Sequence, residues 1–113
     1  MKIWADGKGF YGRKSGYALV FEDNRKPIIV LNEEDKTNNE REYEAVIEAF
    51  KIANNGDEIY SDSQLVVYQI KGKWKVDKEN LRILWQQGFD LLWSKSLQLF
   101  WIPRNENKAG KLI

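Results

Sequence analysis

Hydrophobic and polar residues alternate along the first third of the chain, a pattern typical of β-strands. Residues 2–6 direct alternate side chains to two faces, and the turn-forming sequence Asp-Gly-Lys-Gly begins where they end. Two further runs rich in β-branched and aromatic residues, 16–22 and 26–32, are separated by an Asp-Asn pair that suits a tight reversal. The pattern predicts three strands in an antiparallel meander, with Pro27 at a strand start or edge.

The apolar spacing becomes helical between residues 39 and 54. The buried stripe of this helix consists of Tyr43, Val46, Ile47, Phe50 and Ala53. Residues 37–39 offer a cap at its start. A short strand over 57–62 and a second helix over 63–70 come next. Because a helix separates this strand from the earlier ones, the connection is a crossover, and we expect parallel pairing.

A third helix and a last strand complete the pattern. After an interruption at residues 71–75, Asp77 is placed to cap the third helix. The apolar face of that helix consists of Leu81, Leu84, Trp85, Gly88 and Leu92. Residues 96–103 form the fifth strand. The order βββαβααβ predicts an α/β fold with a five-stranded mixed sheet flanked by helices, in which a C-terminal helix is short or absent.

Composition narrows the class of protein. A chain of 113 residues with 42% hydrophobic residues suits one globular domain over residues 1–113. The absence of cysteine excludes disulfides and thiolate zinc sites, and the absence of histidine excludes an imidazole base or ligand. Neither a signal-peptide core nor an apolar run near the roughly 20 residues of a membrane span is present, so we expect a cytoplasmic protein without a membrane partner.

Aromatic residues are frequent in the last helix and strand, and their spacing fits burial in the core. This expectation covers Trp85, Phe89, Trp93, Phe100 and Trp101. The formal net charge is only +1, but the charges are unevenly distributed, with an acidic run at 33–35 and a basic run containing Lys71, Lys73 and Lys75. We therefore expect partners to depend on local patches rather than on the total charge.

Three carboxylates stand out from this pattern. Asp6 and Asp62 each end a predicted strand, and the carboxyl ends of strands line ligand crevices in open α/β sheets. Glu42 lies at the edge of the buried helical stripe, where an acid costs free energy unless a cation compensates it. Three acids brought together repel one another, and oxygen ligands suit Mg²⁺ or Mn²⁺. We interpret them as a metal site; the alternative is three unrelated turn, cap or surface residues.

Such a site supports phosphoryl transfer without histidine. One metal ion can activate the attacking water while a second neutralises the leaving oxygen, with the two ions about 3.5–4 Å apart. The spacing of the acids alone does not decide between this chemistry and three unrelated turn, cap or surface residues. The surrounding motifs do.

The strings ADGKG, KTNNEREYEAVIEAF, YSDSQLVVYQIKGKWKV and LFWIPRNENKAGKL occur in the order and spacing of the type 1 ribonuclease H family. The sequence resembles a compact member that lacks the large basic protrusion, and the resemblance covers nearly the whole chain. It implies a ribonuclease H-like fold and two Mg²⁺ or Mn²⁺ ions held by Asp6, Glu42 and Asp62. The implied activity is endonucleolytic hydrolysis of the RNA strand of RNA–DNA hybrids, leaving 5′-phosphate ends.

The same resemblance implies substrate contacts by Gly7, Asn38, Asn39 and Gln64. Short amides suit the 2′-hydroxyl and backbone groups of a minor groove, although either asparagine can instead be a helix cap. Further contacts are expected from the short basic remnant, through Lys73 and Trp74, and from Arg104 after the last strand. A solvated loop and a surface arginine are the alternatives.

Two departures from the family pattern bear on activity. The family places a fourth acid in an Asn-x-x-Ala-Asp segment, where this chain has Ala109, Gly110 and Lys111. Asn107 is our candidate substitute, and Glu106 or a residue beyond Ile113 are alternatives. The loop histidine of many members is also missing. The alternative function is therefore a catalytically weak or inactive hybrid-binding module with no obligate protein partner; a resolvase-like or integrase-like activity is disfavoured by the Thr-Asn-Asn and Asp-Ser-Gln contexts.

Overall fold

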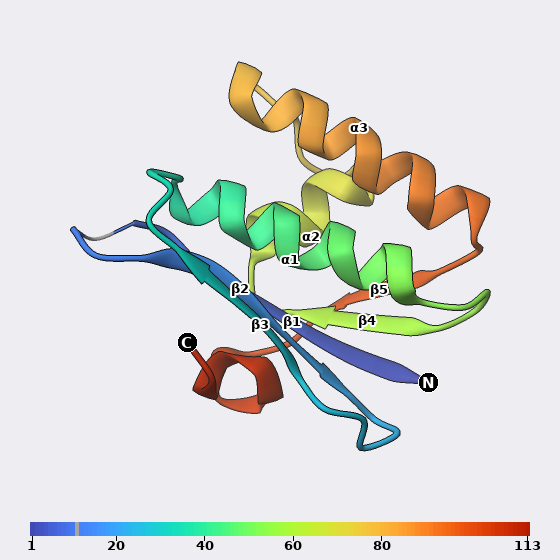
Figure 1. Ribbon diagram of the computed structural model, residues 1–113. Coiled ribbons are helices and arrows are strands. Elements are labelled where there is room, and N and C mark those ends of the chain that lie inside the picture. Colours follow the sequence, from blue (N-terminus) through green and yellow to red (C-terminus); the bar gives the residue numbers. More distant parts are fainter. Residues whose placement is uncertain (11) are drawn as a thin grey trace.

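The computed structural model describes residues 1–10 and 12–113. The described chain forms five strands, three α-helices and two short 3₁₀ segments (Figure 1). In chain order these are β1 (Lys2–Lys8), β2 (Ser15–Phe21), β3 (Ile28–Asn32), α1 (Asn38–Ile52), β4 (Glu58–Ser61), α2 (Gln64–Ile70), α3 (Glu79–Ser94), β5 (Gln98–Trp101), η1 (Arg104–Glu106) and η2 (Lys108–Lys111). The predicted order βββαβααβ is confirmed, and the C-terminal helix is reduced to single 3₁₀ turns.

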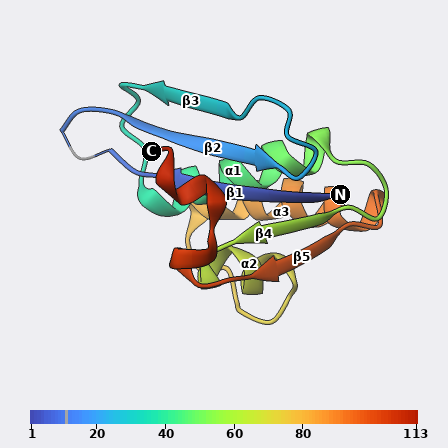
Figure 2. The same ribbon diagram turned by 90° about the horizontal axis from the view of Figure 1, so that it is seen from below.

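The strands form one sheet in the order β3-β2-β1-β4-β5 (Figure 2). The pairs β1–β2 and β2–β3 are antiparallel, so the expected meander is present. The pairs β1–β4 and β4–β5 are parallel, as the crossovers through α1 and through α2 and α3 require. Pro27 directly precedes the edge strand β3, where a residue without an N–H does no harm to the ladder.

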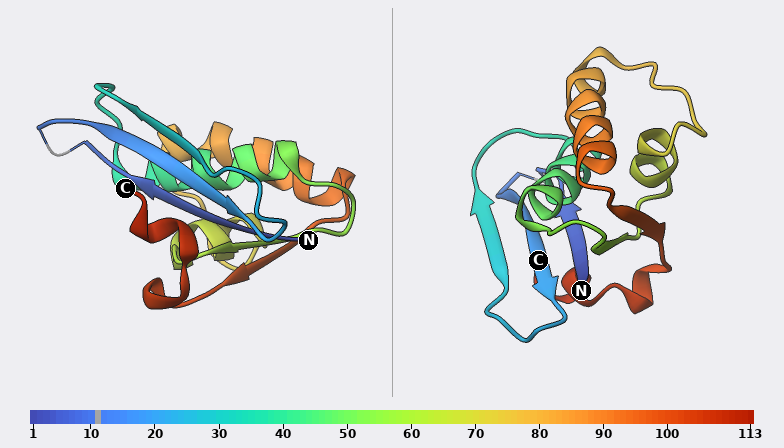
Figure 3. Two further views of the ribbon diagram at one scale, coloured as in Figure 1. Left: turned by 60° about the horizontal axis from the view of Figure 1, so that its bottom comes forward. Right: turned by 90° about the vertical axis from the view of Figure 1, so that its right-hand side faces the viewer.

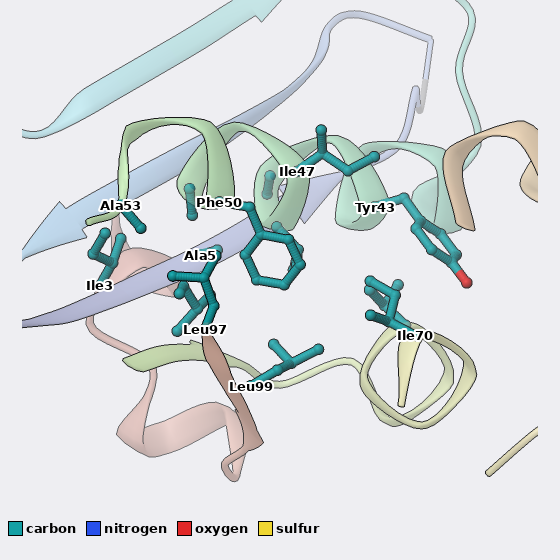
Figure 4. Close-up of a cluster of buried hydrophobic side chains, with 14 of the residues drawn as sticks. Ile3, Ala5, Tyr43, Ile47, Phe50, Ala53, Ile70, Leu97 and Leu99 are labelled. Atoms are coloured by element: carbon teal, nitrogen blue, oxygen red, sulfur yellow. The ribbon is translucent and has the colours of Figure 1, made fainter. Parts of the chain in front are cut away.

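All three helices lie on one face of the sheet, and the core fills the space between the two layers (Figure 1). Figure 4 shows side chains from α1, β1 and β5 converging there. Phe50, Ile3 and Leu99 are buried in this cluster together with the predicted helical stripe. The apolar face of α1, set by its helical period, thus packs against the apolar face of the sheet, set by the two-residue period of the strands. This packing excludes water from between the layers.

The opposite face of the sheet is covered only in part, by η1 and η2 (Figure 3). Trp4, Tyr60 and Phe100 stand on neighbouring strands of this face, with ring centroids 5.9 Å and 5.5 Å apart along the row. Ala109 of η2 packs with Trp4 in a small second cluster. The C-terminal segment therefore crosses the sheet near the end of β1.

Helix α1 is held at both ends by side chains. At its start Thr37 forms a capping box with Glu40, so the cap within residues 37–39 is Thr37. At its end Lys95 Nζ donates to the carbonyl oxygens of Phe50, Lys51 and Ala53 at 2.8, 2.7 and 3.0 Å. A residue 42 to 45 positions further along the chain thereby completes the helix terminus.

Two details of α3 differ from the expectation. Asp77 does not cap the helix, because Lys78 occupies the cap position without a side-chain hydrogen bond and Asp77 lies 3.7 Å from Lys75. Trp93 is 69% exposed, so its predicted burial is wrong, whereas Trp85 is half-buried and donates its indole N–H to the carbonyl oxygen of Gln69. Within the described ranges, no helix has the length and apolar character needed to cross a membrane.

Candidate metal centre

Three carboxylates converge where β1, β4 and α1 meet. Asp6 lies on β1, Asp62 follows the last residue of the parallel neighbour β4, and Glu42 is in the first turns of α1. Each offers an oxygen atom, and these atoms all lie within 4.8 Å of one another. The acids come together because parallel strands end at the same edge of the sheet and because the crossover helix begins there.

Gly7 brings the helix close enough for this arrangement. A Cβ atom at Gly7 would lie 2.3 Å from the backbone carbon and oxygen of Arg41 and 2.4 Å from the nitrogen of Glu42. No other residue fits this contact without moving the backbone. The N–H of Gly7 also donates to Glu42 Oε1, and this bond aims the carboxylate at Asp6. Gly7, expected to touch substrate, thus has a structural role that the sequence did not reveal.

Burial and mutual repulsion raise the pKa values of Asp6 and Glu42. Desolvation and the charge of Asp62 raise the pKa of Asp6 to about 6. Desolvation and the charge of Asp6 raise the pKa of Glu42 to about 9, although the hydrogen bond from Gly7 opposes that rise. Near neutral pH and without a cation, Glu42 therefore retains its proton and forms a hydrogen bond with ionised Asp6.

Asp62 differs from the other two acids. Its backbone oxygen accepts a hydrogen bond from the indole N–H of Trp101 at 3.1 Å, which anchors the end of β4 to β5. Ser63 next to it caps α2 by accepting a hydrogen bond from the N–H of Val66. Yet Asp62 Oδ2 is buried and has no hydrogen-bond partner among the described residues. A buried carboxylate oxygen without a partner is costly, and a divalent cation would compensate it.

The donor set fits a hard divalent cation. All three side chains offer carboxylate oxygen, which Mg²⁺ and Mn²⁺ prefer over the softer ligands of zinc or copper sites. A cation at this point would give the unpartnered oxygen of Asp62 a ligand bond. It would also displace the proton held by Glu42. The geometry thus agrees with the metal site inferred from the sequence.

A cavity of about 180 Å³ opens beside the acids. It is lined by Asp6, Gly7, Lys8, Asn38, Glu42, Arg104 and Ile113. The Oδ1 of Asn38 accepts a hydrogen bond at 3.1 Å from the N–H of Gly9, the residue that directly follows β1. Arg104 is near enough to lower the pKa of Asp6 by its charge. Lys8 and Arg104 thus add positive charge to the rim of an acidic cavity.

The remaining expected substrate residues are not among those that line this cavity. Asn39 and Trp74 line a neighbouring hollow of about 200 Å³, and Trp74 is 46% exposed. Lys73 lies over the ring of Tyr68, at 5.9 Å from its centroid. Gln64 is exposed at the start of α2, two residues after Asp62.

The loop that carries Trp74 is fixed from inside the protein. Gln69 accepts a hydrogen bond from the hydroxyl of Tyr43 at 2.5 Å and donates through Nε2 to the carbonyl oxygen of Lys75 at 2.9 Å. Both Gln69 and Tyr43 are buried. The exposed basic loop is therefore connected to α1, the helix that also carries Glu42.

Asn107 takes a different place from the one expected of a fourth ligand. Its Nδ2 donates to the carbonyl oxygen of Ala5 at 2.9 Å, and its Oδ1 accepts from the N–H of Ala109 at 3.1 Å. The side chain is buried, and both ends of its amide are occupied in holding η2 against β1. Asn107 therefore attaches the C-terminal segment to β1.

Gly110 of that segment lies beside Asp6. A Cβ atom at Gly110 would lie 3.8 Å from Asp6 Oδ2, an ordinary contact distance. The position has room for a side chain beside the cluster but provides none. The sequence pattern does not show that Gly110 lies beside Asp6 and that the Asn107 amide is bound elsewhere; the path of the folded chain determines this.

Comparisons with known proteins show a matching family and similar folds. The sequence model of the family described as RNase H matches residues 1–108. Among solved structures, the N-terminal RNase H domain of Rv2228c from Mycobacterium tuberculosis, determined as a fusion with maltose-binding protein, is 28% identical with a TM-score of 0.82, and the match covers 98% of this chain and 88% of that one.

Two further structures show similar agreement. RNase H1 from the halophilic archaeon Halobacterium salinarum is 25% identical, with a TM-score of 0.79 and coverage of 98% of this chain and 91% of that one. LC11-RNase H1, solved in complex with an RNA/DNA hybrid, is 26% identical, with a TM-score of 0.76 and the same coverage of both chains. The five-stranded mixed sheet with its helices is thus a fold that these proteins share.

Proposed function

This chain belongs to the ribonuclease H family, and from that premise we propose that it is a metal-dependent endonuclease that hydrolyses the RNA strand of RNA–DNA hybrids. The observation that carries the proposal is the meeting of Asp6, Glu42 and Asp62 within 4.8 Å, with a buried Asp62 oxygen that has no partner among the described residues. The hybrid in the LC11-RNase H1 structure supports the choice of substrate.

The three acids would hold two Mg²⁺ or Mn²⁺ ions. Bound ions would supply an activated water and neutralise the leaving oxygen, which leaves a 5′-phosphate on the product. The chain's own residues prepare the site. Gly7 orients Glu42, Trp101 fixes the strand end beside Asp62, and the β1–β4 pairing sets the separation of the two aspartates.

The surroundings of the acids fit a hybrid duplex. Asn38, Gly7 and Arg104 line the cavity beside the acids, where the scissile phosphate would lie. Asn39 and Gln64 offer short amides for the minor groove, where 2′-hydroxyl groups distinguish RNA from DNA. Lys73 and Trp74 lie outside this cavity and would contact the backbone of the second strand.

A hybrid-binding module with little or no turnover is the second candidate. It is favoured by Gly110, which lies against Asp6 and contributes no ligand atom, while Asn107 is occupied elsewhere. Under this alternative the substrate contacts would be the same and only the metal affinity or turnover would differ.

Cleavage of an end-labelled RNA–DNA hybrid in Mg²⁺ and, separately, in Mn²⁺ tests the proposal. We expect wild type to cut the RNA strand of the hybrid and to leave RNA duplex and DNA duplex intact. The Asp62→Asn variant should bind the hybrid without cutting it. Tight binding by wild type with no cleavage in either metal would instead establish the binding module.

A further inference from the structure

Strand β3 forms one outer edge of the sheet, and Figure 2 shows no other element beyond it. Ile29 and Leu31 point to the face without helices and are 48% and 47% exposed. The strand Ile28–Asn32 contains no charged residue. An uncovered edge strand of this composition presents unpaired backbone groups next to exposed apolar side chains.

Natural edge strands usually carry protection against pairing with another chain, such as a charge within the strand, a bulge or a covering loop. Along β3 the pairing with β2 runs without a bulge, from Leu19–Ile28 to Ser15–Asn32. Among the residues that the structure describes, the protective feature present is Pro27, which precedes the strand. The edge is therefore available for β-sheet extension.

The residues that flank β3 have opposite charges. Arg25 and Lys26 precede the strand, and the acidic run 33–35 follows it. When a strand flanked in this way pairs antiparallel with a copy of itself, the basic end of each copy faces the acidic end of the other. The pattern is self-complementary, as an interface with two-fold symmetry requires.

We propose that this edge is an interface between two copies of the chain, in which the two β3 strands pair antiparallel about a two-fold axis at Val30. In this register Ile29 lies opposite the partner's Leu31, and Lys26 lies opposite the partner's Glu34. Shifting the axis by one residue either way would leave one exposed apolar side chain opposite Pro27 or Glu33. The register at Val30 is the one that pairs both apolar side chains and both charged ends.

The charges at the two ends are accessible for such pairing. Lys26 is exposed and forms no ion pair among the described residues. Glu34 is 54% exposed, and within its own chain the same carboxylate oxygen, Oε2, lies 3.0 Å from Lys36 and 3.9 Å from Arg41. Arg25 is already bound to Asp23, which makes Lys26 the informative cation to change.

The proposed pairing leaves the acid cluster open and does not depend on its function. Strand β1 lies two positions inward from β3 in the sheet. The interface is one strand wide, below the size of stable dimers, and we expect a dissociation constant on the order of 10⁻⁴ M. The joined sheet would have ten strands, with one acid cluster toward each end.

Cysteine crosslinking tests the register directly because the chain contains no cysteine. We expect a mixture of Ile29→Cys and Leu31→Cys to form disulfide-linked dimers under mild oxidation, several-fold faster than either variant alone. Directly opposite residues in antiparallel strands have the Cα separation that a disulfide needs, and residues two positions away do not. Equal rates in all three samples would overturn the proposed register.

Sedimentation equilibrium up to about 1 mM protein tests association itself. We expect Lys26→Glu to weaken dimerisation about tenfold, because symmetry converts two attractive pairs into repulsive ones. Lys78→Glu carries the same charge change at the start of α3 and should leave dimerisation unchanged. A wild-type protein that stays monomeric at the highest concentration would overturn the proposal, as would equal effects of the two variants.

Discussion

Arg41 and Glu42 are consecutive residues in the same helical turn, both are buried and ionisable, and their surroundings are opposite. Arg41 is surrounded by hydrogen-bond acceptors from β2, β3 and its own helix. Glu42 is placed against two further acids, Asp6 and Asp62. The two neighbours therefore compare a buried ionisable group whose charge the protein compensates with one whose charged form it leaves uncompensated.

The Arg41 environment is complete. Its Nε donates to Ser15 Oγ at 2.9 Å, its Nη1 to Glu44 at 3.0 Å, and its Nη2 to Asn32 Oδ1. Glu44 is also bound by Lys36 at 2.7 Å. This network joins the starts of α1 and β2 to the end of β3, which makes it a structural fastener.

The acid cluster has no such compensation, since the pKa values of Asp6 and Glu42 rise and Asp62 keeps a buried oxygen without a partner in the described chain. Burial alone does not distinguish the two sites. Whether the fold provides the opposite charge does, and we interpret the uncompensated cluster as the metal site proposed above. The predictions below test this difference.

The largest effect is expected from Asp62→Asn. The variant keeps the size of the side chain and removes the charge, so hybrid cleavage should fall at least about 100-fold, the upper range for groups that only support a metal ligand. Thermal stability without metal should stay equal or rise, because one repelling charge is gone. Cleavage assays and thermal melts check both. A matched change at an exposed acid, Asp90→Asn, should alter neither, and full activity of Asp62→Asn would refute the assignment.

Removing the satisfied charge should act on stability instead. Arg41→Met leaves Glu44 and Asn32 without their buried partner, and we expect the free energy of unfolding to fall by about 3 kcal/mol. Urea unfolding measures this change. Lys51→Met breaks an exposed ion pair with Glu48 and should cost less than about 0.5 kcal/mol. Equal losses in the two variants would mean that the Arg41 network stabilises nothing.

The acid cluster also predicts a pH dependence. Folding raises the pKa of Asp6 from 3.8 to about 6 and that of Glu42 from 4.5 to about 9. The folded protein therefore binds more protons than the unfolded chain within this window, and metal-free stability should fall as pH rises from about 4 to about 9. Thermal melts in EDTA measure the slope.

Two comparisons isolate the cluster from the other groups that titrate. Asp6→Asn should make the slope in EDTA shallower, since it removes one acid and the repulsion on Glu42. Saturating Mg²⁺ should flatten the slope of the wild type, because a bound cation stabilises the ionised forms. An unchanged slope in both experiments would show that the cluster is not the source.

The smallest effect is expected from Gly110→Asp. The new side chain would begin 3.8 Å from Asp6 Oδ2 and add a fourth carboxylate to the cluster. We expect Mn²⁺ affinity measured by calorimetry to rise about tenfold, because ligand charge count sets the affinity of such sites. Gly110→Asn has nearly the same size without the charge and should change affinity much less. Equal affinities for the two variants would place residue 110 outside the metal site.

Local patterns were sufficient for much of this structure. Strand alternation, the stripe of α1 and the crossover order depend on near neighbours in sequence, and each element formed as expected. Asp6 and Asp62 were predictable as partners because parallel strand ends meet at one edge. The burial of Arg41 had a weak signal, since Ala45 and Ala49 follow it at helical spacing and leave room for a long side chain.

The sequence by itself determined the fold class, the family and the three acids, since these depend on residue types and spacing. Only the tertiary structure decided which groups face those acids. It placed Gly110 rather than Asn107 beside Asp6, left Trp93 in solvent, and made Gly7 a packing contact for α1. Such outcomes depend on the path of segments that are distant in sequence, and a local pattern contains no information about how closely two backbones approach.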